Sequence, residues 1–277
     1  MKKIIVPVDF SIYSENALQT AAFLAKQSDA EVLVVHMLEL SNAIISQSES
    51  YAQQETVFYL KLAEKRFNKF LQKDYLSEVK VKPIIKHFKI FSELDELARE
   101  ENADLIVMGS KGTSGLKEMF IGSNTEKVIR YAHVPVLVVK DTPIVSKLEK
   151  AVFACDFSDD DVSPYLEAKT FFEKLNCSLQ LVYVSTPTTK FKSTKEIEEK
   201  MVKFFNKTNE DVNEVSNVKV ISDYSVEKGV LYYTNKSESD ILAVATHGRK
   251  GISHFFEGSI SEDIANHSKL PVLSFKI

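Results

Sequence analysis

The chain has 277 residues, 44% of them hydrophobic, and its 35 basic and 39 acidic residues give a net charge of −4. This composition indicates a globular protein with a packed core, and neither half is basic enough for nucleic acid to be the main partner. No apolar run approaches the roughly 20 residues of a membrane span, and the first residues lack a signal-peptide core. The only cysteines, Cys155 and Cys177, have no metal-like spacing, so we expect a reduced, cytoplasmic protein.

Short apolar runs alternate with helical patterns through the first half. Buried strands are predicted at 4–8, 32–37, 105–108 and 136–139, with a weaker one at 79–85. Between them, apolar stripes at helical spacing run through Ala17, Ala21, Leu24 and Ala25, through Leu60, Ala63, Phe67, Phe70 and Leu71, and through Leu94, Leu97 and Ala98. Residues 39–56 are polar and rich in Ser and Gln, and we expect a long loop or lid there. The alternation predicts βαβ units, hence a parallel sheet with helices on both faces.

The second half repeats this order. Its strands are predicted near 151–155, 179–184, 218–222, 240–244 and 271–275. Four segments recur in the same order: Ile4–Ser11 as Ala151–Ser158, Ala103–Val107 as Ser239–Ala243, Gly122-Ser123 as Gly258-Ser259, and Val134–Leu137 as Leu270–Leu273. The sequence therefore predicts a tandem duplication, with domains at 1–142 and 148–277.

Seven of the eight glycines lie in two short windows, although an average chain of this length would carry about 19. The windows hold Gly109, Gly112, Gly115 and Gly122 in the first half, and Gly248, Gly251 and Gly258 in the second. Glycine is needed where the backbone takes a positive φ or approaches a ligand closely. Each window follows the fourth predicted strand of its half, so we expect a pair of ligand-binding loops.

Ligands of open α/β sheets bind beyond the carboxyl ends of the strands, where the strand order reverses. Asp9 follows the first predicted strand and the glycine loop follows the fourth, so both face one crevice if these strands are neighbours. Gly122-Ser123-Asn124 begins a predicted helix whose N–H groups and dipole suit a phosphate. Asp9 suits ribose hydroxyls or an adenine amine. The loop is neither a P-loop nor the G-x-G-x-x-G of dinucleotide folds.

At these residues the chain resembles the universal stress protein family. The nucleotide-binding members carry G-x2-G-x9-G-[ST], which stands here as Gly109-(x)2-Gly112-(x)9-Gly122-Ser123. The opening Val6-Pro7-Val8-Asp9-Phe10-Ser11 and the closing Val134-Pro135-Val136-Leu137-Val138-Val139 are also similar to that family. The resemblance covers both halves. It implies two tandem Rossmann-like domains of the adenine nucleotide alpha-hydrolase type, each a five-stranded parallel sheet, in a stress-response protein that binds ATP with Mg²⁺.

The resemblance also implies a role for each residue of the first-half site. Asp9 and Gly109 lie near the ribose, and Met37, which follows His36, contacts adenine through its backbone. Pro7 lines the adenine pocket, and the last glycines and the serine hold the phosphates. The predicted nucleotide-binding residues are Pro7, Val8, Asp9, Met37, Gly109, Gly112, Gly122, Ser123 and Asn124.

The second half departs from this pattern. Ala245 replaces the first glycine, Glu257 precedes Gly258-Ser259, and an acidic run at 159–161 lies near Asp156. Carboxylates repel a triphosphate, and more strongly away from bulk water. We expect the first half to bind nucleotide and the second to bind weakly or not at all. Whether the second-half set binds any ligand stays open; it consists of Asp156, Val184, Gly248, Gly258 and Ser259.

Structural roles compete with these assignments. Asp9 and Ser11, like Asp156 and Ser158, are suited to capping the following helix. We favour a ligand contact for Asp9, because its loop is intact, and a cap for Asp156. His36 lies within an apolar run and is interpreted as a core residue. His247, His254 and His267 do not form a metal set.

Three functions remain open. The first is a nucleotide-responsive regulatory protein that is not an efficient enzyme, with slow ATP hydrolysis left open. The second is a nucleotide-independent interaction or scaffold module, in which the last strands, 135–139 and 271–275, pair across the halves in place of a family dimer. The third, an adenylyl-transferring enzyme, is disfavoured because the Ser-Gly-Gly-x-Asp-Ser and His-x-Gly-His signatures are absent. The preference among ATP, ADP, AMP and cyclic nucleotides, further homodimerisation and the protein partners also stay open.

Overall fold

The chain divides into two compact units, with the boundary between Val145 and Ser146. The computed structural model describes residues 1–37, 49–86, 92–111, 122–188, 191–246 and 260–277. Among these residues, no helix combines the length and the apolar character needed to cross a membrane.

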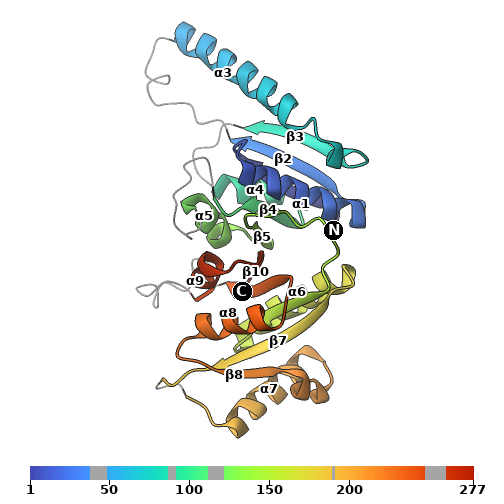
Figure 1. Ribbon diagram of the computed structural model, residues 1–277. Coiled ribbons are helices and arrows are strands. Elements are labelled where there is room, and N and C mark those ends of the chain that lie inside the picture. Colours follow the sequence, from blue (N-terminus) through green and yellow to red (C-terminus); the bar gives the residue numbers. More distant parts are fainter. Residues whose placement is uncertain (38–48, 87–91, 112–121, 189–190, 247–259) are drawn as a thin grey trace. The chain divides into compact units, whose positions relative to one another are not determined.

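The first unit is a five-stranded sheet in the order β3-β2-β1-β4-β5, and every strand pair is parallel (Figure 1). From β1 the chain proceeds outward through β2 to β3, then returns to place β4 and β5 on the other side of β1. This reversal makes the first and fourth strands neighbours, the condition on which the predicted site depends. The elements are β1 (Lys3–Val8), α1 (Ile12–Ser28), β2 (Glu31–Met37), α3 (Glu49–Phe70), the 3-10 helix η1 (Asp74–Leu76), β3 (Lys80–Lys86), α4 (Ser92–Glu100), β4 (Leu105–Gly109), α5 (Ser123–Tyr131) and β5 (Val136–Val139).

Helices cover both faces of this sheet. Connections between parallel strands are right-handed, so the reversal at β1 puts α1 and α3 on one face and α4 and α5 on the other. In keeping with this, α4 packs against α5, and α1 packs across β1 and β4. Central strands buried on both faces read as unbroken apolar runs. Ile4 and Ile5 of β1 and Leu105 and Ile106 of β4 are all fully buried, which explains why these strands could be located from sequence.

The second unit repeats the topology, with the order β8-β7-β6-β9-β10 and parallel pairing throughout. As in the first unit, helices that follow one another share a face: α6 packs against α7, and α8 against α9. Its elements are β6 (Lys150–Ala154), the 3-10 helix η2 (Asp159–Asp161), α6 (Val162–Lys174), β7 (Ser178–Ser185), α7 (Thr194–Thr208), the 3-10 helix η3 (Val212–Asn217), β8 (Lys219–Ser222), α8 (Val226–Lys236), β9 (Ile241–Thr246), α9 (Ile260–His267) and β10 (Val272–Lys276).

One repeated aspartate has a clear structural role. Asp104 Oδ2 accepts hydrogen bonds from the backbone N–H groups of Lys2 and Lys3, at 2.5 and 3.0 Å. Asp240 Oδ2 does the same for Glu149 and Lys150, at 2.8 and 2.9 Å. In each unit this carboxylate holds the beginning of the first strand beside the beginning of the fourth.

The prediction of a loop at 39–56 is wrong for its last eight residues, because α3 begins at Glu49. Residues 49–56 contain Ala, Gln and Glu but no glycine or proline, and such residues favour helix. Their polar composition led to the loop assignment, although a solvent-facing helix has the same composition. The remainder of that predicted loop, up to residue 48, lies outside the described residues. Of the predicted stripe on this helix, Ala63, Phe67 and Phe70 are buried, whereas Leu60 is 36% exposed.

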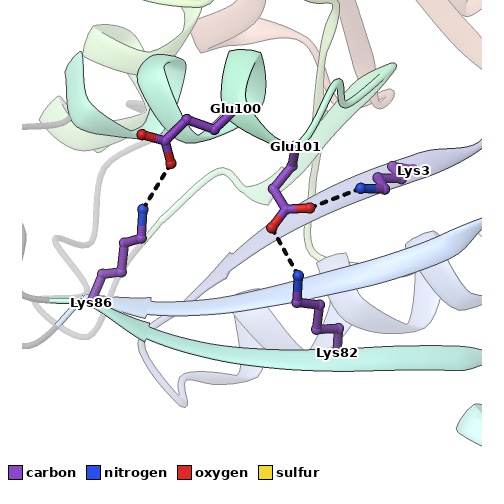
Figure 2. A network of polar contacts seen from close by, with 5 residues as sticks. All are labelled: Lys3, Lys82, Lys86, Glu100 and Glu101. Atoms are coloured by element: carbon purple, nitrogen blue, oxygen red, sulfur yellow. Dashed lines mark hydrogen bonds and ion pairs between the residues drawn. The ribbon is translucent and has the colours of Figure 1, made fainter.

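Ion pairs join α4 to two strands of the first unit (Figure 2). Glu101, directly after α4, accepts hydrogen bonds from Lys3 of β1 and Lys82 of β3, both at 2.8 Å. Glu100 pairs with Lys86 at 3.1 Å. The hydrogen bonds from Lys3 and Lys82 lower the pKa of Glu101 to about 2. The carboxylate of Glu101 therefore connects the central strand, the edge strand and a covering helix.

Candidate functional site

The carboxyl ends of β1, β2 and β4 bring five of the predicted site residues to one edge of the sheet. Val8 pairs with His36, so Met37 stands one residue beyond the end of β1. Ile5 pairs with Ile106, and this register, continued by three residues, brings Val8 level with Gly109. Pro7 is buried within β1, and Asp9 follows the strand directly.

Helix α5 begins at the same edge. The Gly122 N–H donates to the carbonyl of Ser110 at 2.8 Å, and Thr125 Oγ1 donates to the carbonyl of Gly109 at 3.0 Å. Gly122 is the N-cap and supplies no side-chain hydrogen bond to the first turn. Ser123 is the first helical residue, and Asn124 beside it is exposed. Gly112 and the side chain of Ser123 lie outside the described residues.

Asp9 and Ser11 make different local hydrogen bonds at the beginning of α1. Ser11 is the N-cap of α1, and its hydroxyl accepts from the Ser14 N–H at 3.2 Å. Asp9 Oδ1 accepts from the Ser11 N–H at 3.0 Å, which shapes the turn before the helix. Asp9 is only partly buried and lines a cavity of about 360 Å³.

Phe10 occupies an unusual conformation beside this cavity. Its φ of 64° lies in the left-handed region, where a bulky residue is rare. The ring centroid stands 4.4 Å from that of His36 and 5.4 Å from that of Phe70. His36 Nδ1 donates to the carbonyl of Val8 at 2.9 Å, and the side chain is partly buried rather than in the core. Phe157 repeats the conformation in the second unit, with φ of 59°. The sequence analysis missed both phenylalanines, although their recurrence after Asp9 and Asp156 was visible.

Gly109 is required for packing as well as for the predicted ligand. A β-carbon at this position would lie 2.7 Å from the backbone oxygen of Tyr13 and 2.9 Å from its Cβ. Helix α1 therefore approaches the end of β4 more closely than any side chain permits. The packing role of Gly109 was not predicted from the sequence, and its contact with a ribose stays a prediction.

The sequence analysis also missed three cations. Arg66, Lys69 and Lys73 line the cavity beside Asp9, together with Phe10 and Phe70. Arg66 and Lys69 lie on α3, and Lys73 follows its last turn. Arg66 and Lys69, three residues apart, share a face of α3, and this spacing could have indicated a common surface. We refer to Arg66, Lys69 and Lys73 as the cation triad.

Comparison with known proteins agrees with this architecture. The sequence profile of the universal stress protein family matches residues 1–140 and, a second time, residues 147–276. The chain belongs to the universal stress protein family.

Individual proteins are similar to half of the chain or to nearly all of it. Universal stress protein MJ0577 of Methanocaldococcus jannaschii is 35% identical over 153 residues, which cover 50% of this chain and 94% of that protein. The crystal structure of a universal stress protein from Archaeoglobus fulgidus DSM 4304 covers 99% of this chain and 96% of that one, with a TM-score of 0.70 at 22% identity. A universal stress protein solved in complex with cAMP covers 50% of this chain and 96% of that one, at 23% identity with a TM-score of 0.33.

In the second universal stress repeat, Asp156, the residue equivalent to Asp9, makes the same turn contact and has further partners. Asp156 Oδ1 accepts from the Ser158 N–H at 2.7 Å, and Asp161 Oδ2 accepts from the Asp156 N–H at 3.0 Å. Lys200 Nζ donates to the Asp156 carbonyl and lies 3.6 Å from its Oδ1. Asp156 therefore stabilises the turn after β6 and does not cap α6. That helix begins at Val162, with Asp161 as its N-cap. The acidic run 159–161 forms η2, directly before the amino end of that helix.

Burial changes the titration of two groups next to Asp156. Asp161 is 6% exposed, and its burial, together with the neighbouring Asp156 carboxylate, raises its pKa to about 6. Cys155 is also buried, and burial raises the pKa of its thiol. Val184 is buried in β7, whereas Gly248, Gly258 and Ser259 lie outside the described residues.

Proposed function

We propose that the first unit binds an adenine nucleotide, ATP with Mg²⁺, at the carboxyl ends of β1 and β4. The observation that carries this proposal is the hydrogen bond from Gly122 N–H to Ser110 O, 2.8 Å long. It attaches the beginning of α5 to the end of β4, one strand away from Asp9. The positive end of the helix then meets the phosphates, while Asp9 accepts from the ribose hydroxyls.

Nucleotide binding at this edge suits regulation better than efficient catalysis. His36 Nδ1 donates to the Val8 carbonyl and its ring packs against Phe10, so this side chain stabilises the turn that follows β1. We therefore propose a cytoplasmic stress-response protein whose partners respond to the bound nucleotide.

The second unit is proposed to bind nucleotide weakly or not at all. Lys200 engages both the carbonyl and the carboxylate of Asp156, so a ribose would have to displace an ion pair. Ala245 has a methyl where the first unit has Gly109, and in place of the first turn of α1 the chain forms the 3-10 helix η2. These differences, together with the acidic residues of η2, support the predicted asymmetry.

Calorimetric titration of the full chain with Mg-ATP tests both parts. We expect one site per chain, lost in Asp9→Asn and kept in the matched variant Asp156→Asn. Asparagine preserves the turn made by either aspartate, so both variants should fold. Two sites per chain would overturn the asymmetry. An absence of binding would overturn the nucleotide assignment and favour the interaction module.

A further inference from the structure

The cation triad gives the cavity beside Asp9 an excess of positive charge. Arg66, Lys69 and Lys73 contribute three cations, against the carboxylate of Asp9 in the same wall. Among the described residues, only Lys73 of the three is in an ion pair, with Glu15 at 2.5 Å. Phe10 and Phe70 form the apolar part of the lining. A small anion would therefore find several donors at one opening.

The second unit carries the same triad. Lys200, Lys203 and Lys207 on α7 have the spacing of Arg66, Lys69 and Lys73. The phenylalanines confirm the correspondence: Phe204, one residue after Lys203, stands 5.1 Å from Phe157, just as Phe70, one residue after Lys69, stands 5.4 Å from Phe10. Both triads therefore face the turn that follows the first strand of their unit.

In the second unit, the chain supplies its own anions to this triad. Lys207 pairs with Asp159 at 2.5 Å, and Lys200 contacts Asp156. The residue equivalent to Asp159 in the first unit is Ile12, which is 61% exposed and carries no charge. The first unit thus has no carboxylate at position 12. Glu15 pairs with Lys73, the counterpart of Lys207, which leaves Arg66 and Lys69 as the cations of the cavity wall that have no ion pair among the described residues.

We propose that the cation triad of the first unit binds a phosphate group, at a site separate from the glycine loop. Arg66 offers a planar fork of donors that matches a phosphate, and the two lysines add point charges. The carboxylate of Asp159 takes the place of that anion in the second unit. The phosphate has two possible sources, a second phosphate on the nucleotide held by Asp9 or a separate phosphate ion or monoester. Only the first source rests on the proposed function.

The arginine side-chain Nε–Hε resonances of the full chain provide a direct test, because the sequence has only four arginines. The Arg66 signal is identified by its loss in Arg66→Gln. Titration with inorganic phosphate at constant ionic strength should shift this signal to saturation. Lys69→Gln and Lys73→Gln should each raise the dissociation constant about tenfold, as expected for a charge-assisted hydrogen bond. Lys65→Gln, an exposed cation outside the cavity lining, should leave it unchanged.

A second variant reproduces the arrangement of the other unit. Ile12→Asp places a carboxylate where the second unit has Asp159, and it should weaken phosphate binding about tenfold or more by competing for the same cations. Position 12 is exposed, so this substitution should not disturb folding. An Arg66 signal that does not saturate, or a loss of affinity in Lys65→Gln equal to that in Lys69→Gln, would overturn the proposal.

Two further titrations distinguish the sources. If adenosine 3′,5′-bisphosphate shifts Arg66 at a concentration at least tenfold below that of inorganic phosphate, the nucleotide supplies the group. If inorganic phosphate shifts Arg66 equally with and without saturating Mg-ATP, a separate molecule supplies it. Either result supports the site. Saturable phosphate binding in a chain that fails to bind Mg-ATP would refute the proposed function but not this inference.

Discussion

The backbone oxygen of Tyr13 lies 2.7 Å from the position that a β-carbon would take at Gly109. A glycine of the nucleotide motif thus also sets the distance between helix α1 and the end of β4. The same residue therefore serves the core and the proposed site, and its substitution is expected to affect both.

Gly109→Ala should lower the free energy of unfolding by about 1–3 kcal/mol, because α1 must move away from β4 to admit the methyl group. Urea denaturation measures this change. The reverse exchange at the equivalent position, Ala245→Gly, should cost no more than about 1 kcal/mol, since it removes a methyl group and adds backbone freedom. Equal effects of the two variants would contradict the packing role of Gly109.

Asp161 should make the stability of the second unit depend on pH between about 4 and 6. Its pKa is about 6 in the folded unit, against an ordinary 3.8, so the folded state binds the proton more tightly. The stabilising contribution is therefore complete below pH 3.8 and is lost as the pH rises through 6. Asp161→Asn keeps the acceptor for the Asp156 N–H. In this variant the thermal midpoint should change less with pH across this range. The control is Asp160→Asn, at an exposed neighbouring position, which should leave the pH dependence of the thermal midpoint unchanged.

Glu101 should affect stability with the opposite sign. Its folded pKa of about 2 lies below the ordinary 4.5, so its contribution is complete above pH 4.5 and is lost as the pH falls toward 2. Glu101→Gln should lower the thermal midpoint at pH 7 and make it less sensitive to acid below pH 4.5. Glu100→Gln should have a smaller effect, because Glu100 has one ion-pair partner and its side chain is 65% exposed. A wild-type acid profile in Glu101→Gln would refute the role given to this carboxylate.

Combined Gly122→Ala and Ser123→Ala should weaken ATP binding at least tenfold by removing the hydroxyl donor and crowding the phosphates. The φ of −62° at Gly122 suits alanine, so the chain should still fold. Calorimetry checks the affinity and circular dichroism checks the fold. The matched change in the second unit, Ser259→Ala, should leave ATP affinity unchanged. A loss of affinity there would instead indicate that the second unit takes part in binding.

The sequence located the strands well because the central ones are buried on both faces and therefore read as unbroken apolar runs. The sequence was less informative about the positions of elements with a polar composition or few buried residues. The first turns of α3 are polar, so only their backbone shows that they are helical. The edge strand β3 contains Pro83 and has no fully buried residue, which explains its weak signal.

The sequence by itself determined the duplication, the alternation of strands and helices, the glycine motif and the family. Each of these can be recognised from local periodicity or from the recurrence of short segments. Only the tertiary structure decided that β1 and β4 are neighbours, that Tyr13 requires a glycine at 109, and that Arg66, Lys69 and Lys73 stand beside Asp9. These contacts join residues roughly 60 to 100 positions apart, and packing of the whole unit, rather than any local pattern, brings such residues together.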